Sequence, residues 1–267
     1  IIKGEKVCAL AITEPGAGSD MGGITTNAKR DNNHWVINGS KTFTTNGVYG
    51  DLYFVSARTG SHGPRHRQIS QFLVERDTPG LVVTKKLDKT GMLSSDTAEL
   101  VFDDVKVPET SLLGKENRGF YQLASGLQRE RLIAAILSIS ASNQALEDSK
   151  VYLKQRTAFD RPLSDLQSLR HRFTNIATEL EAARQLTYYA SALFANGKEA
   201  EKIVSMAKLY STEVANRIAY EAVQFHGGYG YIRETGVERL MRDAKITQIY
   251  EGTSEIQRVV IARYLLK

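Results

Sequence analysis

Residues 98–124, AELVFDDVKVPETSLLGKENRGFYQLA, contain the point at which the character of the sequence changes. The segment begins as the last of several β-rich runs, passes a turn at Leu113-Gly114 and continues with a helical pattern. The sequence therefore predicts an α+β fold in two parts. A β-barrel domain is expected over residues 1–115, and an all-α helical bundle over residues 116–267.

Short β-rich runs occupy the first part of the chain. Turn pairs such as Asn38-Gly39 and Pro79-Gly80 separate them. Several short strands at this spacing are typical of a barrel or sandwich. The expected strands cover residues 7–13, 34–45, 51–58, 71–75, 81–84 and 98–107.

The second part has the period of α-helices. Apolar residues from Leu166 to Leu186, and again from Ile203 to Phe225, recur every three or four positions. Ser164 and Gln167 match a capping box, which predicts a helix start there. With a helix expected over residues 119–152, these helices form an antiparallel bundle. Shorter helices are expected over residues 237–244 and after Thr253.

Composition limits the classes of function. The chain has 35 Lys plus Arg against 30 Asp plus Glu, a net charge of +5 that suits an anionic ligand but is too diffuse to indicate nucleic acid. The single cysteine, Cys8, excludes an intrachain disulfide and a CxxC redox pair. No apolar run is long enough to predict a membrane span. The histidines are scattered, so we expect no metal site.

Two glycine-rich segments could approach a ligand closely. Residues 13–20, TEPGAGSD, follow a strand and could present backbone amides to a phosphate or a polarised ring oxygen, although a plain turn is the simpler interpretation. Residues 224–231, QFHGGYGY, form either a glycine-capped helix end or a turn pressed against a flat or anionic cofactor. The segment at 13–20 matches neither a dinucleotide-binding nor a P-loop pattern.

Two carboxylates could act as a general base. Glu251 lies between Tyr250 and Gly252, just before the last expected helix, where it is either a charge–dipole partner of that helix or a base that reaches into a cleft. Glu130 lies between two arginines in the first expected helix, where a solvated ion-pair face is the alternative.

Five segments, in this order, resemble motifs of the acyl-CoA dehydrogenase family, and the resemblance covers essentially the whole chain. They are LAITEPGAGS (10–19), KTFTTNG (41–47), RTAFDRPLSDLQ (156–167), QFHGG (224–228) and YEGTSEIQR (250–258). Family members usually begin with an all-α domain that precedes the β domain. This sequence lacks that domain, so we expect it to be a truncated form.

The resemblance implies an FAD enzyme that oxidises a saturated acyl-CoA to the trans-2-enoyl-CoA. A carboxylate would remove the α-proton while the β-hydride passes to flavin N5. Burial would raise the pKa of this base, and hydrogen bonds to the thioester carbonyl would stabilise the enolate. Electron-transferring flavoprotein is the implied acceptor and fatty acid β-oxidation the implied pathway. A homotetramer in the bacterial cytoplasm or the mitochondrial matrix is the implied setting.

The resemblance also implies roles for individual residues. Glu251 is the implied base. Glu130 is the alternative, because Glu130-Arg131-Leu132 matches the helix motif that carries the base in isovaleryl and long-chain members. Two ionised carboxylates in one cleft would repel each other and raise one pKa. Features of both branches occur in the chain, so the acyl length stays open.

The remaining implied contacts belong to FAD and the substrate. Asp160 stands where the family motif usually has Gly, which would bring a carboxylate close to the pyrophosphate. The implied substrate contacts are Ser19, Arg131 and Gly252. The implied FAD contacts are Leu10, Ile12, Thr13, Ser19, Phe43, Thr44, Thr45, Arg156, Phe159, Gln167, Gln224, Gly227, Gly228, Thr253 and Glu255.

Two other functions are compatible with the same motifs. An acyl-CoA oxidase or flavin oxygenase of this fold would pass its electrons directly to oxygen. A catalytically silent, truncated scaffold would keep the fold without turnover. A relative in the same fold class binds DNA, but the modest net charge of +5 does not support that function here.

Overall fold

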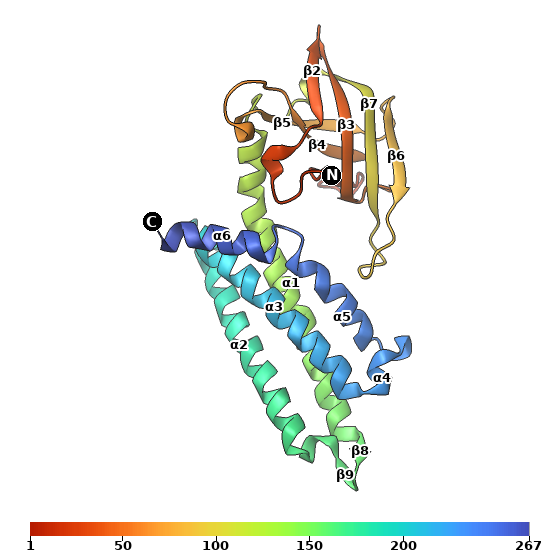
Figure 1. Ribbon diagram of the computed structural model, residues 1–267, viewed down its shortest axis with the longest axis vertical. Helices are drawn as coiled ribbons and strands as arrows, with labels where there is room; N and C mark the ends of the chain where they lie inside the picture. The colour runs from red at the N-terminus through yellow and green to blue at the C-terminus, as the bar shows by residue number, and fades with distance from the viewer. Residues whose placement is uncertain (267) are drawn as a thin grey trace. The chain divides into compact units, whose positions relative to one another are not determined.

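The computed structural model describes residues 1–266, and the chain divides into two compact units, residues 1–125 and 126–267. The first unit is mainly β and the second is helical, which confirms the fold class expected from the sequence (Figure 1). The expected domain limits, 1–115 and 116–267, stay a prediction. The division between the compact units falls later, within the helix α1.

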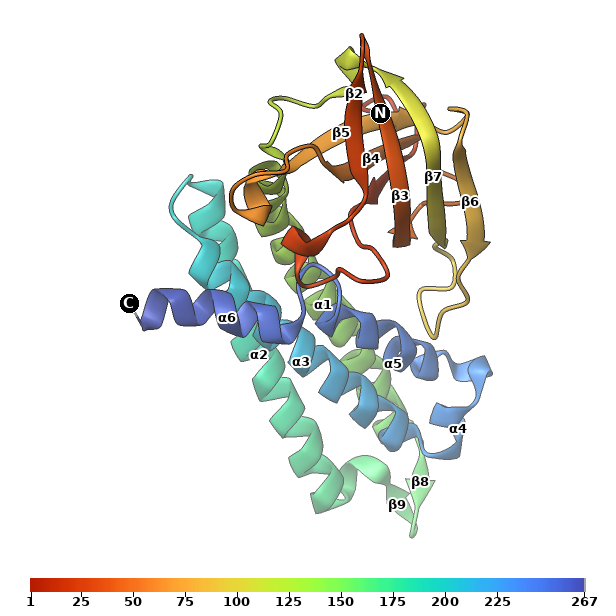
Figure 2. The ribbon, with the colours of Figure 1, turned by 45° about the horizontal axis from the view of Figure 1, so that its top comes forward.

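The first unit is a half-barrel built on one seven-stranded sheet. Its strands follow the order β1-β4-β2-β3-β7-β6, and β5 also pairs with β4. Neighbouring strands are antiparallel, except that β4 runs parallel to β1 and to β2. Strands β2, β3, β7 and β6 lie side by side in both views (Figures 1 and 2). The strand bounds are Cys8–Ala11 (β1), Asn27–Asp31 (β2), His34–Thr45 (β3), Leu52–Arg58 (β4), Ile69–Glu75 (β5), Leu81–Lys86 (β6) and Thr97–Pro108 (β7).

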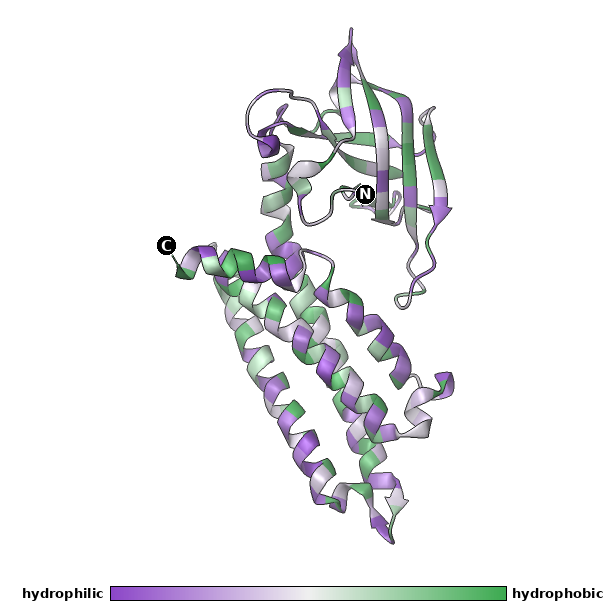
Figure 3. Ribbon diagram, viewed as in Figure 1, coloured by the Kyte–Doolittle hydropathy of each residue, from purple (hydrophilic) through white to green (hydrophobic). Residues whose placement is uncertain are grey.

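The core of this unit follows from the alternation of side chains along the strands. Trp35 and Phe72 meet edge to face with ring centroids 5.2 Å apart, and both side chains are buried. Alternate residues face outward, so the strands carry both hydrophilic and hydrophobic bands (Figure 3). Strand β2 was not predicted, because NAKRD contains a single apolar residue, Ala28. Pairing with β3 forms this strand.

The second unit consists of long helices packed side by side with shorter ones (Figures 1 and 2). Ile176 and Leu180 of α2 and Val214 and Ile218 of α3 belong to one buried apolar cluster. None of the helices that the structure describes combines the length and apolarity needed to cross a bilayer. The helix bounds are Gly119–Gln155 (α1), Gln167–Ala195 (α2), Glu201–His226 (α3), Gly228–Tyr231 (α4), Val237–Lys245 (α5) and Ser254–Leu265 (α6).

The capping box expected at Ser164 is wrong. Ser164 lies in a short 3₁₀ turn, Leu163–Asp165, and α2 begins three residues later with Leu166 at its N-cap and no side-chain cap. Pro162 and the adjacent hairpin set the path of the chain before the helix. The last helix does have such a cap, because Thr253 accepts a hydrogen bond from the backbone N–H of Ile256.

A two-residue hairpin connects α1 to α2. Strands Thr157–Ala158 (β8) and Arg161–Pro162 (β9) pair through the turn Phe159-Asp160. Both turn residues have positive φ angles, +54° for Phe159 and +60° for Asp160. Positive φ at both central residues is the signature of a type I′ turn, in which Gly is favoured at the second position. Asp160 therefore occupies a position that imposes backbone strain on any residue with a Cβ.

Replacing Asp160 by Gly is expected to raise the free energy of unfolding by about 0.5 to 1 kcal/mol, because Gly adopts this φ without a steric penalty. Asp160→Ala keeps the Cβ and removes the short polar side chain, so it is expected to lower stability by about 1 kcal/mol. Urea unfolding followed by far-ultraviolet circular dichroism measures both values. An Ala variant as stable as the Gly variant would show that the turn imposes no such constraint.

Candidate active site

A buried ion pair joins the first two motifs within the first unit. The Lys41 ammonium donates to the Glu14 carboxylate at 2.8 Å and to the carbonyl of Ile12 at 2.9 Å, and both charged side chains are almost fully buried. Glu14 also accepts hydrogen bonds from Thr25 and Thr26. This charged pair therefore holds the loop that follows β1 against β3. Both charged groups also form hydrogen bonds to other partners.

Burial affects the two partners differently: it lowers the pKa of Lys41 to about 8, so Lys41 is still mostly charged at pH 7. Burial alone would raise the pKa of Glu14, but the Lys41 charge and the hydrogen bonds from Lys41, Thr26 and Thr25 lower it to about 2. The carboxylate therefore stays ionised at neutral pH, and the loop keeps its partner.

A β-bulge in β3 turns Phe43 outward. The register with β7 shifts between Lys41 and Thr44, and Phe43 has a φ of +54°. As a result Lys41 and Thr42 are both buried, whereas Phe43 is 67% exposed. The backbone at Phe43 is therefore strained, and its large apolar side chain is exposed. An exposed aromatic ring in this arrangement suits contact with a flat ligand.

The residues of this unit that are expected to contact FAD differ in their exposure to solvent. Leu10, Phe43 and Thr45 are exposed, and Ile12 and Thr13 are half-buried. A backbone hydrogen bond from Thr42 to the Thr13 carbonyl, 2.8 Å long, ties the two motifs together. Ser19 is exposed on the loop. Thr44 is buried, and its hydroxyl has no hydrogen-bond partner among the residues that the structure describes.

In the second unit, Glu251 lies on a strained turn before α6. Glu251 has a φ of +55° and Gly252 a φ of +87°, so two consecutive residues are left-handed. The Arg131 guanidinium of α1 donates to the Glu251 carbonyl at 3.3 Å. Gln257 of α6 donates to the same carbonyl at 3.3 Å and to the Gly252 carbonyl at 2.8 Å. Lys208 of α3 donates to the Gly252 carbonyl at 2.9 Å.

The charges around Glu251 oppose one another. Burial, together with a hydrogen bond and negative charge from Glu130, raises the pKa of Glu251 to about 8, against the positive charges of Lys208 and Arg131. A hydrogen bond between two carboxyl groups requires a proton on one of them. The two candidate bases therefore lie close together, and the protonated form of Glu251 is favoured at neutral pH.

Arg131 lies against the backbone of this turn, and Gly252 is part of the turn. The Arg131 side chain is buried and directed to the Glu251 carbonyl. Sequence reasoning missed Lys208 and Gln257, both of which are 0% exposed. Gln257 lies within the motif at 250–258, but Lys208 belongs to none of the five motifs. A lysine on the apolar face of a predicted helix was the only available signal.

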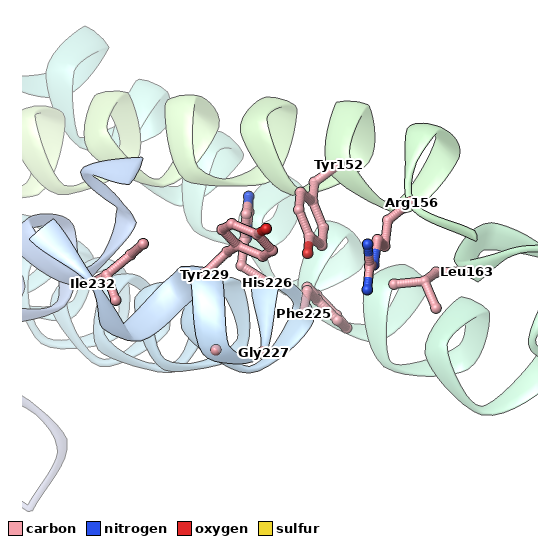
Figure 4. Close-up of a pocket in the computed structure, with 9 residues that line it drawn as sticks. Tyr152, Arg156, Leu163, Phe225, His226, Gly227, Tyr229 and Ile232 are labelled. Carbon is pink, nitrogen blue, oxygen red and sulfur yellow. The ribbon is translucent and has the colours of Figure 1, made fainter. Parts of the chain in front are cut away.

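A cavity of about 500 Å³ lies between the end of α1 and the α3–α4 junction. Tyr152 of α1 and Arg156, the residue after α1 ends, project toward it, and His226 and Gly227 lie on the other side (Figure 4). Tyr152 stacks on His226 with ring centroids 4.2 Å apart. At Gly227 and Gly228 no atom lies within 4 Å of the position of an added Cβ. An arginine, flat aromatic walls and open backbone fit the adenosine diphosphate part of FAD.

The other residues expected to contact FAD lie outside this cavity. Phe159 is at the hairpin tip and 84% exposed, while Gln167 and Gln224 are exposed on α2 and α3. Thr253 and Glu255 line a separate hollow of about 300 Å³ at the start of α6. The assignment of all of these residues to FAD stays a prediction. Within residues 1–266, no group of three or more His, Cys, Asp or Glu side chains is placed to hold a metal ion.

Both units match models of domains from one protein family. Residues 9–105 match the family model of the acyl-CoA dehydrogenase middle domain, and residues 117–266 match that of the acyl-CoA dehydrogenase C-terminal domain. A solved structure of acyl-CoA dehydrogenase from Geobacillus kaustophilus superposes with a TM-score of 0.97 at 45% identity. The match covers 99% of this chain and 70% of that one.

Curated relatives are similar in sequence over essentially the whole chain. An acyl-CoA dehydrogenase of Bacillus subtilis is 45% identical over 266 residues, which is 100% of this chain and 70% of the relative. The long-chain specific mitochondrial enzyme of Sus scrofa is 42% identical, over 98% of this chain and 61% of the relative. A subunit of the caffeyl-CoA reductase–Etf complex of Acetobacterium woodii is 42% identical, over 100% and 70%. The chain thus spans 61 to 70% of the length of these relatives.

Replacing Glu14 by Gln is expected to lower the free energy of unfolding at pH 7 by about 3 to 5 kcal/mol, because it leaves the Lys41 charge buried without its partner. The pKa of Glu14 lies below its ordinary value, so the stability due to its charge is present above about pH 4.5 and is lost as the pH falls toward 2. The deficit of the variant should therefore shrink at pH 3.

The single tryptophan, Trp35, is buried in the first unit, so urea unfolding followed by its fluorescence measures this effect. Glu109→Gln is the matched control, since Glu109 forms an exposed pair with Arg30 in the same unit. The control is expected to change stability by less than about 1 kcal/mol. Equal losses in the two variants would contradict the special role of Glu14.

Proposed function

The chain belongs to the acyl-CoA dehydrogenase family, and on this premise we propose that it catalyses the FAD-dependent α,β-dehydrogenation of an acyl-CoA thioester with Glu251 as the base. The observation that carries the proposal is the environment of Glu251. Its carboxyl group has a pKa raised to about 8 and lies on a turn held by Arg131, Gln257 and Lys208. A base whose pKa lies near the working pH is suited to proton abstraction.

The α-proton of a thioester is weakly acidic, so the base must be both strong and well placed. Burial and the charge of Glu130 make the Glu251 carboxylate more basic than an exposed glutamate. The hydrogen bonds to its backbone carbonyl fix the backbone from which the carboxylate projects. We propose that the backbone N–H of Glu251 donates to the thioester carbonyl and stabilises the enolate.

Glu130 acts in this proposal as the partner of the base. Its carboxyl group forms a hydrogen bond with Glu251 and raises the pKa of Glu251. It thereby sets the pH at which the base becomes free to act. Glu130 remains the alternative base, and the experiments below distinguish the two roles.

Each unit has residues that fit FAD. In the first unit Leu10, Thr13, Phe43 and Thr45 would contact the flavin ring, and the left-handed conformation of Phe43 presents its ring for stacking. In the second unit, the cavity around Arg156 and the two glycines that follow His226 would bind the adenosine diphosphate part. FAD, when bound, would supply the acceptor for the β-hydride.

The partners follow from the family. We propose electron-transferring flavoprotein as the acceptor, fatty acid β-oxidation as the pathway and a homotetramer as the assembly. The relative in the caffeyl-CoA reductase–Etf complex supports the first of these. An acyl-CoA oxidase would differ in the rate at which its reduced flavin is reoxidised by air, and a silent scaffold would show no turnover.

Replacing Glu251 by Gln is expected to lower the rate of α-proton exchange by about 10²- to 10⁴-fold, because the base is lost. The measurement uses an acyl-CoA analogue without β-hydrogens, so that exchange with D₂O proceeds without hydride transfer. Glu130→Gln is the matched variant and should retain exchange within about 10-fold. Loss of exchange in Glu130→Gln alone would reverse the assignment of the base.

The pH dependence of exchange gives a second test. The base must be deprotonated, so the rate should rise with pH through the pKa of Glu251, about 8. Glu130→Gln removes the neighbouring negative charge, so the midpoint should move to lower pH by about 1 unit. An unchanged midpoint in a folded Glu130→Gln protein would show that Glu130 does not influence the base.

A further inference from the structure

Lys208 is a charged residue in the middle of α3 whose side chain has no solvent exposure. Its exposed fraction is 0%, although lysines are almost never fully buried unless they are paired. Removing an ammonium group from water is costly, and it requires both hydrogen bonds and a nearby negative charge. Apolar packing therefore does not explain why a lysine occupies this position.

The geometry around Lys208 gives that reason. Its Nζ donates to the Gly252 carbonyl at 2.9 Å, one residue after Glu251. Burial and the nearby Arg131 disfavour the Lys208 charge, whereas Glu251 and Glu255 favour it, and the pKa of Lys208 falls to about 8. The ammonium form therefore predominates at pH 7. The charged groups that face this position are therefore Arg131 and Glu130 from α1, Glu251 from the turn and Glu255 from α6.

The backbone at Glu251 is strained. Left-handed backbone costs about 1 to 2 kcal/mol at a residue with a Cβ, and Glu251 is such a residue. The Gly252 carbonyl accepts hydrogen bonds from both Gln257, at 2.8 Å, and Lys208, at 2.9 Å. Both donors hold the same oxygen, but only Lys208 adds a positive charge.

We propose that Lys208 is a positioning residue for Glu251, which holds the Gly252 carbonyl and places a buried positive charge beside the base to oppose the negative charge of Glu130. This inference rests on the proposed function, in which Glu251 removes the α-proton. Glu130 makes the base harder to deprotonate and Lys208 makes it easier. The balance between the two sets the pH range in which exchange occurs.

Lys208 and Gln257 donate to the same Gly252 carbonyl, so variants of the two residues distinguish the hydrogen bond of Lys208 from its charge. Lys208→Met removes both the hydrogen bond and the charge, whereas Gln257→Met removes a hydrogen bond to the same oxygen without changing any charge. Both variants should lower the plateau rate of α-proton exchange by about 10- to 100-fold, because the turn is less well held. Only Lys208→Met should also move the midpoint upward, by about 1 pH unit.

A second readout does not depend on FAD. In protein that contains ¹³C-labelled glutamate, the carboxyl resonance missing from Glu251→Gln identifies Glu251, and its titration gives the midpoint directly. Lys198→Met, on an exposed lysine, is the control and should leave both readouts unchanged. Circular dichroism checks folding, and Lys208→Gln, which also removes the charge, is measured if Lys208→Met does not fold.

The possible outcomes distinguish the inference from the proposal beneath it. An upward shift in the Lys208 variant that is absent in Gln257→Met supports the role of the buried charge. Equal midpoints in the folded Lys208 variant and the unsubstituted protein would overturn it. If Glu251→Gln exchanges the α-proton as fast as the unsubstituted protein, the proposed function itself fails, whatever the Lys208 variants show.

Discussion

The hydrogen bonds to the carbonyl oxygens of Glu251 and Gly252 are the constraint on which the second unit depends. Three helices each contribute a donor: Arg131 from α1, Lys208 from α3 and Gln257 from α6. The bundle thus converges on one left-handed turn, whose strain is offset by donors that have little freedom to move. A carboxyl group that must meet one hydrogen of a substrate needs such fixed support.

The first unit uses the same device. Lys41 is buried and donates to the Ile12 carbonyl, as Lys208 donates to the Gly252 carbonyl, and the two bonds are both 2.9 Å long. In each unit a buried ammonium ties a motif loop to a regular element and is balanced by a nearby carboxylate. The difference lies in the carboxylate: Glu14 is held ionised by its partners, whereas Glu251 is held close to its protonation midpoint. The first pair is structural, and the second is suited to chemistry.

The order of β and helical parts, most strands and all three long helices could be predicted, because alternation and helical periodicity are strong local signals. Strand β2 could not, since this polar segment becomes a strand only by pairing with its neighbours, chiefly β3. The helix start at Ser164 was misplaced because the preceding hairpin overrides a local capping pattern. The motifs indicated Glu251 and Glu130, but the contact between them and the donors Lys208 and Gln257 depend on packing across helices. Such contacts leave no mark on local sequence.

The most direct test of the account is the visible spectrum of the FAD-loaded protein, recorded without oxygen before and after addition of short-, medium- and long-chain acyl-CoAs. The account predicts that at least one length class bleaches the flavin band, because Glu251 removes the α-proton and allows the hydride to leave. The same thioester should leave the band of Glu251→Gln unchanged. A protein that binds FAD but is bleached by no thioester, or a Glu251→Gln variant that bleaches as fast as the unsubstituted protein, would contradict it.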